Sequence, residues 1–137
     1  MSNLLGAGEI REIAEKIGVR PTKKLGQNFV IDANTCRKIV NTAEVGSEDI
    51  ALEIGPGLGS LTLALMEKAK AVVAVEIDNR LAAQLSLTAQ SHGFDPTKLM
   101  VVNDDALNLK SLPVEPTVLV ANLPYNVSVP VLIRILE

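Results

Sequence analysis

The stretch ALEIGPGLGSLTLAL, residues 51–65, has the pattern of a strand, a tight turn and the start of a helix. An acid, Glu53, stands two residues before the first of three alternating glycines, Gly55, Gly57 and Gly59. Glycine permits positive φ angles and a close approach of the backbone to a ligand. The stretch therefore predicts a ligand-binding turn after a strand of a parallel sheet, with a purely structural strand–helix connection as the alternative.

The composition is that of one ordinary domain. The chain has 137 residues, of which 47% are apolar, so a sizeable core can form. The sequence contains no uninterrupted apolar run of about 18 residues, and its first 16 residues carry acids where a secretory signal is apolar. We therefore expect a cytoplasmic protein without a membrane span. The single cysteine, Cys36, argues against an internal disulfide and a multi-cysteine zinc site, and we expect no metal.

The charge is modest and unevenly distributed. A net charge of −3 argues against a surface that binds nucleic acid over its whole extent. Four basic residues nevertheless lie close together in the sequence: Lys16, Arg20, Lys23 and Lys24. Composition alone leaves two interpretations of this cluster open, a solvated loop or a contact to phosphates.

The first 46 residues are predicted to be helical with an irregular loop between two helices. Apolar residues three and four apart indicate a helix over residues 7–17 that ends at Gly18. Asp32 has the character of an N-cap for a second helix, in which Cys36 lies on the apolar face. That position favours a core role for Cys36 over a nucleophilic one.

From residue 50 onward, short apolar strands alternate with helices. We expect strands at 50–54, 71–76, 98–102 and 117–121, and helices at 58–68 and 79–91, the second capped by Asp78. Strands that are apolar along their whole length belong to a parallel sheet covered on both faces. With right-handed crossovers, the pattern predicts a doubly wound, Rossmann-like α/β fold preceded by two helices.

The C-terminal part is predicted to continue with a helix that starts near Ser128 and holds Pro130 in its first turn. The strand at 117–121 would then be an open edge prone to self-association. The expected organisation is an N-terminal helical extension with a loop that caps the cofactor, residues 1–46, and a Rossmann-like core, residues 47–137.

The acid before the glycines favours S-adenosylmethionine over a dinucleotide. In the dinucleotide fingerprint G-x-G-x-x-G, counted from Gly55, the third glycine position is occupied by Ser60. A carboxylate near the turn would also repel a pyrophosphate, whereas S-adenosylmethionine has no phosphate and carries a sulfonium cation and an ammonium group. Glu76, 23 residues past Glu53, ends the second strand, where an acid can accept hydrogen bonds from both ribose hydroxyls.

Polar residues also follow the third strand, in the run of residues 103–106. A carboxylate there can accept a hydrogen bond from the adenine amine while a neighbouring backbone N–H reaches a ring nitrogen. Asp104 and Asp105 are equally well explained as turn residues.

The segment after the fourth strand, residues 122–126, indicates chemistry on the exocyclic amine of a base. The side-chain oxygen of Asn122 and the carbonyl of Leu123 are two acceptors that would free the nitrogen lone pair. Pro124 stiffens the turn, and Tyr125 offers a flat face for an extruded base. In isolation N-x-P-Y is a turn, but after a strand and with the glycine turn upstream it favours a catalytic role through positioning and electrostatics.

Taken together, these motifs resemble the ribosomal RNA adenine N6,N6-dimethyltransferases, most of all the bacterial small-subunit (16S) branch. The erythromycin-resistance methylases are related. The resemblance extends over about residues 20–137 and rests on segments in family order: residues 25–29, 53–62, 75–78, 105–106 and 122–126. It implies the class I S-adenosylmethionine-dependent methyltransferase fold.

The resemblance also implies roles for individual residues. Those implied to contact the cofactor are Gln27, Asn28 and Val30 at its methionine end, Glu53 near its positive charge, Gly55 and Gly57 beneath it, Glu76 at the ribose, Ile77, Asp105 and Ala106 at the adenine, and also Asn122. Those implied to bind and activate the target adenine are Asn122, Leu123, Pro124 and Tyr125.

The implied activity is dimethylation of two adjacent adenines near the 3′ end of small-subunit rRNA, in an assembling ribosomal subunit. On this interpretation Arg20, Lys23 and Lys24 become phosphate contacts. Family members continue with further strands and a small helical domain that engages RNA, so the chain resembles their N-terminal part. Two other functions stay open: a catalytically silent RNA-binding assembly factor of the same fold, and a DNA adenine methylase.

Overall fold

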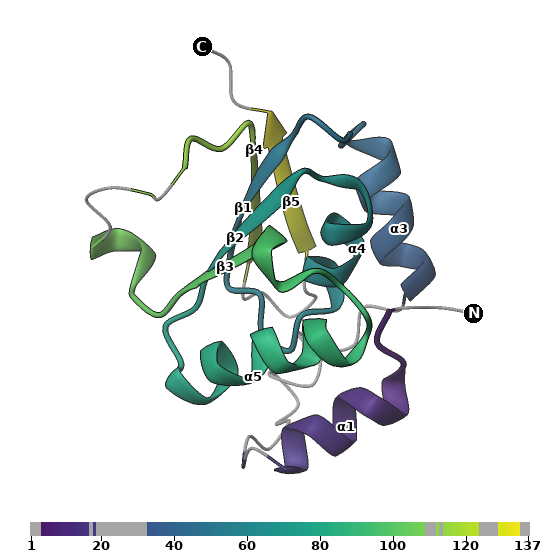
Figure 1. Ribbon diagram of the computed structural model, residues 1–137, viewed down its shortest axis with the longest axis vertical. Coiled ribbons are helices and arrows are strands. Elements are labelled where there is room, and N and C mark those ends of the chain that lie inside the picture. Colours follow the sequence, from purple (N-terminus) through teal and green to yellow (C-terminus); the bar gives the residue numbers. More distant parts are fainter. Residues whose placement is uncertain are drawn as a thin grey trace.

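The computed structural model describes residues 4–16, 18, 33–108, 112, 114–123 and 129–134. In this part of the chain the strands form one five-stranded sheet with the order β3-β2-β1-β4-β5 (Figure 1). The strands are β1 (Ile50–Ile54), β2 (Ala71–Val75), β3 (Leu99–Val102), β4 (Val118–Leu123) and β5 (Val129–Arg134). Strands β1 to β4 are parallel, as predicted, and β5 runs antiparallel to β4.

The helices follow the predicted alternation with the first strands. They are α1 (Ala7–Lys16), α3 (Ala33–Thr42), α4 (Ser60–Lys68) and α5 (Asn79–Ser91), with short 3₁₀ turns η1 (Pro96–Lys98) and η2 (Ala106–Asn108). The Asp78 carboxylate caps α5 by accepting hydrogen bonds from the N–H groups of Arg80 and Leu81. Helix α4 begins two residues later than predicted, because Gly59 has a φ of 101° and lies outside it. None of the helices in the described residues is long and apolar enough to cross a membrane.

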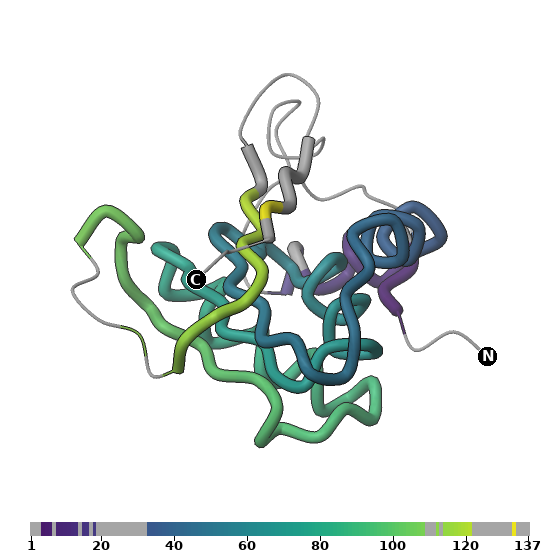
Figure 2. The backbone as a smooth tube through the Cα atoms, turned by 90° about the horizontal axis from the view of Figure 1, so that it is seen from above, coloured from purple at the N-terminus to yellow at the C-terminus, as the bar shows by residue number. Residues whose placement is uncertain are grey.

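One face of the sheet carries the larger core. Buried side chains from α1, α3, α4 and α5 pack there against strand residues that point to the same face, including Ala51, Val72 and Val118. Cys36 of α3 is fully buried in this cluster, which confirms its predicted place in the core. Seen from above, α1 and α3 lie on one side of the sheet and the segment after β3 lies on the other (Figure 2).

The opposite face carries a smaller core. Leu52, Val73 and Val75 point to it, and the partly buried Leu112 and Val114 pack against them. The prediction that both faces of the sheet are covered is therefore confirmed, but in the described residues the helices cover one face and the segment that follows β3 contributes to the other.

The predicted helix near Ser128 is wrong within the described residues, since residues 129–134 form β5. The strand pairs with β4 in an antiparallel ladder in which Ala121 lies opposite Val131. Val129, Val131 and Ile133 alternate along the segment, and β-branched side chains favour extended backbone. A proline is tolerated in an edge strand, so Pro130 does not prevent the pairing. The prediction of an open edge on β4 is wrong for the same reason, because β5 occupies that edge.

Candidate active site

The glycine turn lies at the carboxyl end of β1, and its shape depends on glycine. Gly55, Gly57 and Gly59 have φ angles of 73°, 60° and 101°, in the left-handed region that side chains disfavour. The Gly55 N–H donates to the Val75 carbonyl at 3.0 Å, which ties the turn to the end of β2. A Cβ atom on Gly59 would lie 2.6 Å from a Leu85 methyl carbon, so the close packing of the turn on α5 also requires glycine.

Glu76 directly follows β2 and reaches across to the glycine turn. Its Oε1 accepts a hydrogen bond from the Gly57 N–H at 3.1 Å, and its Oε2 accepts one from the Asp78 N–H at 3.0 Å. The residue is only 5% exposed. Burial raises the pKa of this carboxyl group above its ordinary value, although the N–H groups of Asp78 and Gly57 partly offset the effect.

Glu53 lies deeper in the molecule than Glu76. The β1–β2 register pairs Glu53 with Ala74, so Glu53 stands two positions before the level of Glu76. Its side chain is fully buried and its Oε1 accepts a hydrogen bond from the Thr62 hydroxyl of α4. In this structure Glu53 therefore supports the glycine turn from below. Its predicted contact with a ligand stays a prediction.

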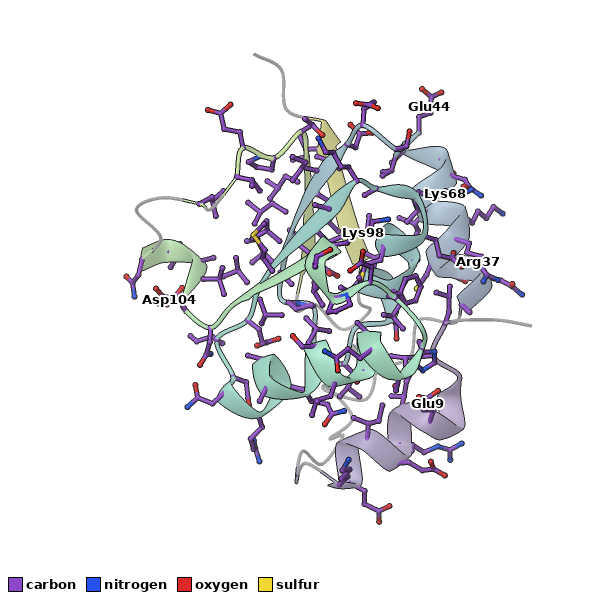
Figure 3. The ribbon with its side chains drawn as sticks, in the orientation of Figure 1. Glu9, Arg37, Glu44, Lys68, Lys98 and Asp104 are labelled. Carbon is purple, nitrogen blue, oxygen red and sulfur yellow. The ribbon has the colours of Figure 1, made fainter. Side chains whose placement is uncertain are left out.

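The residues after β3 approach the end of β2. The Asn103 side-chain amide donates to the Glu76 carbonyl at 2.9 Å. Asp105 accepts a hydrogen bond from the Leu107 N–H at 2.9 Å, so one of its oxygens already stabilises the local turn. Asp104 is exposed and points away from the sheet (Figure 3). Ile77, the residue predicted to lie against an adenine, is 66% exposed at this same edge.

The end of β4 lies beside the end of β1. Ile54 pairs with Ala121, so the backbone of Asn122 is level with Gly55. The main chains of the predicted catalytic segment and of the glycine turn are thus neighbours in the sheet. Other predicted site residues lie outside the described residues: Arg20, Lys23, Lys24, Gln27, Asn28, Val30, Pro124 and Tyr125. Their roles stay predictions.

The edge of the sheet suits a ligand with hydroxyl donors and positive charge. The Gly57 N–H, a donor that a bound pyrophosphate would need, is already bonded to the Glu76 carboxylate. That carboxylate accepts hydrogen bonds from the Gly57 and Asp78 N–H groups, and its two oxygens together have capacity for about four. The residues present therefore fit the ribose of S-adenosylmethionine better than a dinucleotide phosphate. In the described residues no group of three His, Cys, Asp or Glu side chains is placed to hold a metal ion.

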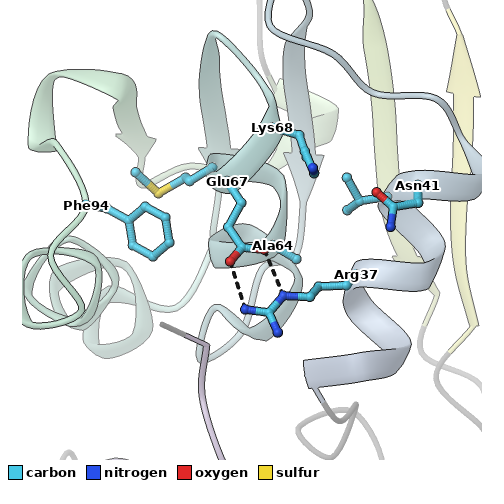
Figure 4. A pocket seen from close by; sticks show the side chains of 8 residues that line it. Arg37, Asn41, Ala64, Glu67, Lys68 and Phe94 are labelled. Atoms are coloured by element: carbon cyan, nitrogen blue, oxygen red, sulfur yellow. Dashed lines mark hydrogen bonds and ion pairs between the residues drawn. The ribbon is translucent and has the colours of Figure 1, made fainter. Parts of the chain in front are cut away.

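A separate hollow of about 540 Å³ lies between α3 and the second half of α4 (Figure 4). Its lining includes Phe94 and an ion pair between Arg37 and Glu67, whose Nη2 and Oε2 atoms are 2.9 Å apart. None of the predicted site residues lines it. The hollow is lined by residues of α3 and α4 and by Phe94, whereas the candidate site lies at the carboxyl ends of the strands, so the two are separate.

No role was predicted from the sequence for two residues that shape this edge, Thr62 and Asn103. A signal for Thr62 existed: it is the one polar residue between Leu61 and Met66, a stretch that is buried all round, and a buried hydroxyl needs a partner. Asn103 gave no comparable signal, since an asparagine after a strand is ordinary turn chemistry.

Comparisons with known proteins agree with the motifs. A family model described as "Ribosomal RNA adenine dimethylase" matches residues 19–137. A curated relative from Leifsonia xyli, named "Ribosomal RNA small subunit methyltransferase A", is 61% identical over 135 residues, which cover 98% of this chain and 48% of the relative. The chain thus spans about half the length of the curated relatives it matches.

Solved structures share the architecture. A dimethyladenosine transferase from Plasmodium falciparum superposes with a TM-score of 0.58 at 34% identity, covering 69% of this chain and 33% of that one. A structure described as 23S rRNA methyltransferase ErmE gives a TM-score of 0.53 at 28% identity, covering 69% of this chain and 48% of that one. Both similarities support the Rossmann-like methyltransferase fold predicted from the strand and helix pattern.

Proposed function

This chain belongs to the ribosomal RNA adenine dimethylase family, and from that membership we propose that the whole protein dimethylates N6 of two adjacent adenines near the 3′ end of small-subunit rRNA. The methyl donor is S-adenosylmethionine, and the step belongs to ribosome maturation in the cytoplasm. The structural observation that supports the cofactor assignment is the Glu76 carboxylate, which accepts a hydrogen bond from the Gly57 N–H at the end of β2.

The cofactor site extends along the carboxyl ends of β1, β2 and β3. Glu76 would accept hydrogen bonds from the ribose hydroxyls, and the exposed Ile77 would cover one face of the adenine. Gly55 and Gly57 would pass beneath the methionine part, because residues without side chains allow that approach. The free capacity of the Asp105 carboxylate and the N–H of Ala106 suit the adenine edge. Gln27, Asn28 and the backbone at Val30 would hold the methionine end.

The chemistry needs positioning more than a strong base. When bound, S-adenosylmethionine supplies a methyl group that its sulfonium already activates. The Asn122 side-chain oxygen and the Leu123 carbonyl would accept hydrogen bonds from the two N–H groups of the adenine amine, which localises the nitrogen lone pair toward the methyl carbon. Tyr125 would stack on the extruded base, with Pro124 stiffening the turn. The amine proton released on methylation passes to solvent.

The RNA would meet the N-terminal extension as well as the strand ends. We propose that residues 1–46 form this extension and residues 47–137 the catalytic core. The basic residues Lys16, Arg20, Lys23 and Lys24 supply phosphate contacts, whose strength falls with added salt. A net charge of −3 makes such a local contact more plausible than a broad one.

Calorimetry on the whole protein tests the cofactor assignment. We expect binding of S-adenosylmethionine and of S-adenosylhomocysteine, and no binding of NAD. Binding of NAD alone would overturn the assignment, since it would place a pyrophosphate at a turn where a carboxylate already holds a donor.

Methyl incorporation into unmodified small ribosomal subunits tests the reaction. The Asn122→Ala change should abolish incorporation while it leaves cofactor affinity less affected. Incorporation into DNA but not into subunits would identify a DNA methylase instead, and cofactor-independent RNA binding without any incorporation would identify an assembly factor.

A further inference from the structure

Asn103, for which the sequence predicted no role, joins the ends of two strands. It directly follows β3, yet its side chain bonds to the backbone that follows β2. The Nδ2 atom donates to the Glu76 carbonyl at 2.9 Å and lies 3.4 Å from the Ile77 carbonyl. These two residues are the ones that face the ribose and the adenine in the proposed site.

With this bond, every polar atom of Glu76 has a partner. Its N–H donates to the Val102 carbonyl at 2.9 Å, and its carbonyl accepts from Asn103. Its two carboxylate oxygens accept from Gly57 and Asp78. The backbone of Glu76 is therefore held from the β3 side, and its carboxylate from the turn after β1. A buried acceptor fixed in this way is preorganised for incoming hydroxyl donors.

Local turn formation does not account for the Asn103 side chain. The turn after β3 is already stabilised by the carboxylates of Asp104 and Asp105, which accept from the N–H groups of Asp105 and Leu107. Asn103 is also exposed, so burial of its side chain is not its contribution. Its side-chain amide adds a hydrogen-bond donor to the main-chain carbonyls that follow the neighbouring strand, β2.

We propose that Asn103 is a positioning residue for ribose recognition, because its amide holds the Glu76–Ile77 backbone and thereby aims the Glu76 carboxylate. This rests on the proposed function, in which Glu76 binds the cofactor ribose. Loss of the amide donor keeps the Glu76 carboxylate but lets its backbone shift. The preference for a ligand with ribose hydroxyls over one without them therefore weakens. An aspartate at this position has the same shape but turns an acceptor toward two carbonyl oxygens.

The test compares two ligands rather than one. Calorimetry on the whole protein gives the affinity for S-adenosylhomocysteine and for its 2′-deoxy analogue, and the ratio of the two measures ribose recognition. We expect Asn103→Asp and Asn103→Ala each to reduce this ratio by about fivefold to tenfold, the size typical of one lost hydrogen bond. Asn108→Asp is the matched control, since Asn108 is exposed on the same segment and the change in charge is the same; the ratio should stay unchanged.

Each other outcome has a definite meaning. Equal weakening of both ligands in the Asn103 variants, or no change, overturns the positioning role while the proposed function stands. Equal affinity of the unaltered protein for the two ligands also overturns it, because there is then no ribose contact to position. Failure of the unaltered protein to bind S-adenosylhomocysteine overturns the proposed function and the inference with it. Melting temperatures of all variants identify any that have unfolded, and the alanine variant separates donor loss from added charge.

Discussion

The ends of β1 and β2 each carry a buried glutamate, and the two carboxylates are held in different ways. Glu53 is fully buried within β1 and accepts a hydrogen bond from the Thr62 side chain of α4. Glu76 lies just beyond β2, is 5% exposed and accepts hydrogen bonds from two backbone N–H groups. The same residue type thus serves two regions of one sheet edge.

Depth in the sheet explains the difference. Glu53 stands two register positions before Glu76, below the glycine turn, where helix α4 covers it. Its partner is a side chain of the core, so its effect is on the position of the turn. Glu76 extends past the last strand residue, so its carboxylate keeps acceptor capacity at the edge where ligands bind in open parallel sheets. We therefore expect changes at Glu53 and its partner to affect stability first, and changes at Glu76 to affect ligand binding first.

The largest effect is expected for Glu76→Gln on cofactor affinity. An amide loses the charge and one of the two acceptors, and hydrogen bonds to ionised groups contribute about 1.5–3 kcal/mol each. The dissociation constant for S-adenosylhomocysteine, measured by calorimetry, should rise by about 100-fold. Glu115→Gln, which alters an exposed carboxylate, is the control and should change nothing. An affinity that survives Glu76→Gln would contradict the assignment of this edge as the cofactor site.

A smaller effect, on stability, is expected for Thr62→Val. The change keeps the shape of the side chain but removes the hydroxyl donor from the buried Glu53 carboxylate. The free energy of unfolding in urea should fall by about 1–3 kcal/mol, the cost of removing one hydrogen bond to a buried charged group. Thr62→Ser keeps the donor and should lose less. The contrary result is an unchanged free energy of unfolding in Thr62→Val together with a loss of cofactor affinity as large as in Glu76→Gln. It would contradict the assignment of Glu53 to stability and of Glu76 to ligand binding.

Lowering the pH should affect cofactor affinity and the contribution of Glu76 to stability in opposite directions. Burial raises its pKa above the ordinary 4.5, although the N–H groups of Asp78 and Gly57 act against this. Cofactor affinity requires the ionised form, so it should be full at neutral pH and fall as pH is lowered through this raised pKa, starting above pH 4.5. The stability contribution has the opposite sign: it is present below pH 4.5 and is lost as pH rises through the raised pKa. Calorimetric and thermal-unfolding profiles from pH 4 to 8 measure both, and Glu76→Gln should remove both slopes.

The smallest effect is expected for Asp78→Asn. The negative charge of Asp78 contributes to the raised pKa of Glu76, while its side-chain oxygen caps α5. Asparagine keeps a capping oxygen and removes the charge. The acid limb of cofactor binding should therefore move slightly toward lower pH with little change in melting temperature. Movement toward higher pH would mean that the charge of Asp78 acts on a different group.

Local patterns in the sequence predicted most of the fold. Strand 50–54 and helix 79–91 have the predicted bounds, because a short apolar run and a capped 3.6-residue period each have one good structural solution. Residues 129–134 were misassigned because a proline two residues past a serine also fits a helix start. The unpaired edge of β4, a tertiary feature, favours a strand there instead.

The sequence predicted which strand ends form the candidate site, but not which of its acids face the core. The pattern of acids and glycines indicated which strand ends meet, and the structure brings Glu76 and Gly57 into direct contact. Whether an acid faces the ligand or the core depends on strand register, which distinguishes Glu53 from Glu76 and has no local signature. The Asn103 bond depends on the same register across β2 and β3.

A crystal structure of the protein with S-adenosylhomocysteine bound would compare the two glutamates most directly. The expected result is a ribose whose hydroxyls donate to the Glu76 carboxylate, with the amino-acid part beside the Gly55–Gly59 backbone and Glu53 still bonded to Thr62. A ligand seated in the hollow between α3 and α4, or a nucleotide whose phosphates rest on the glycine turn, would contradict it.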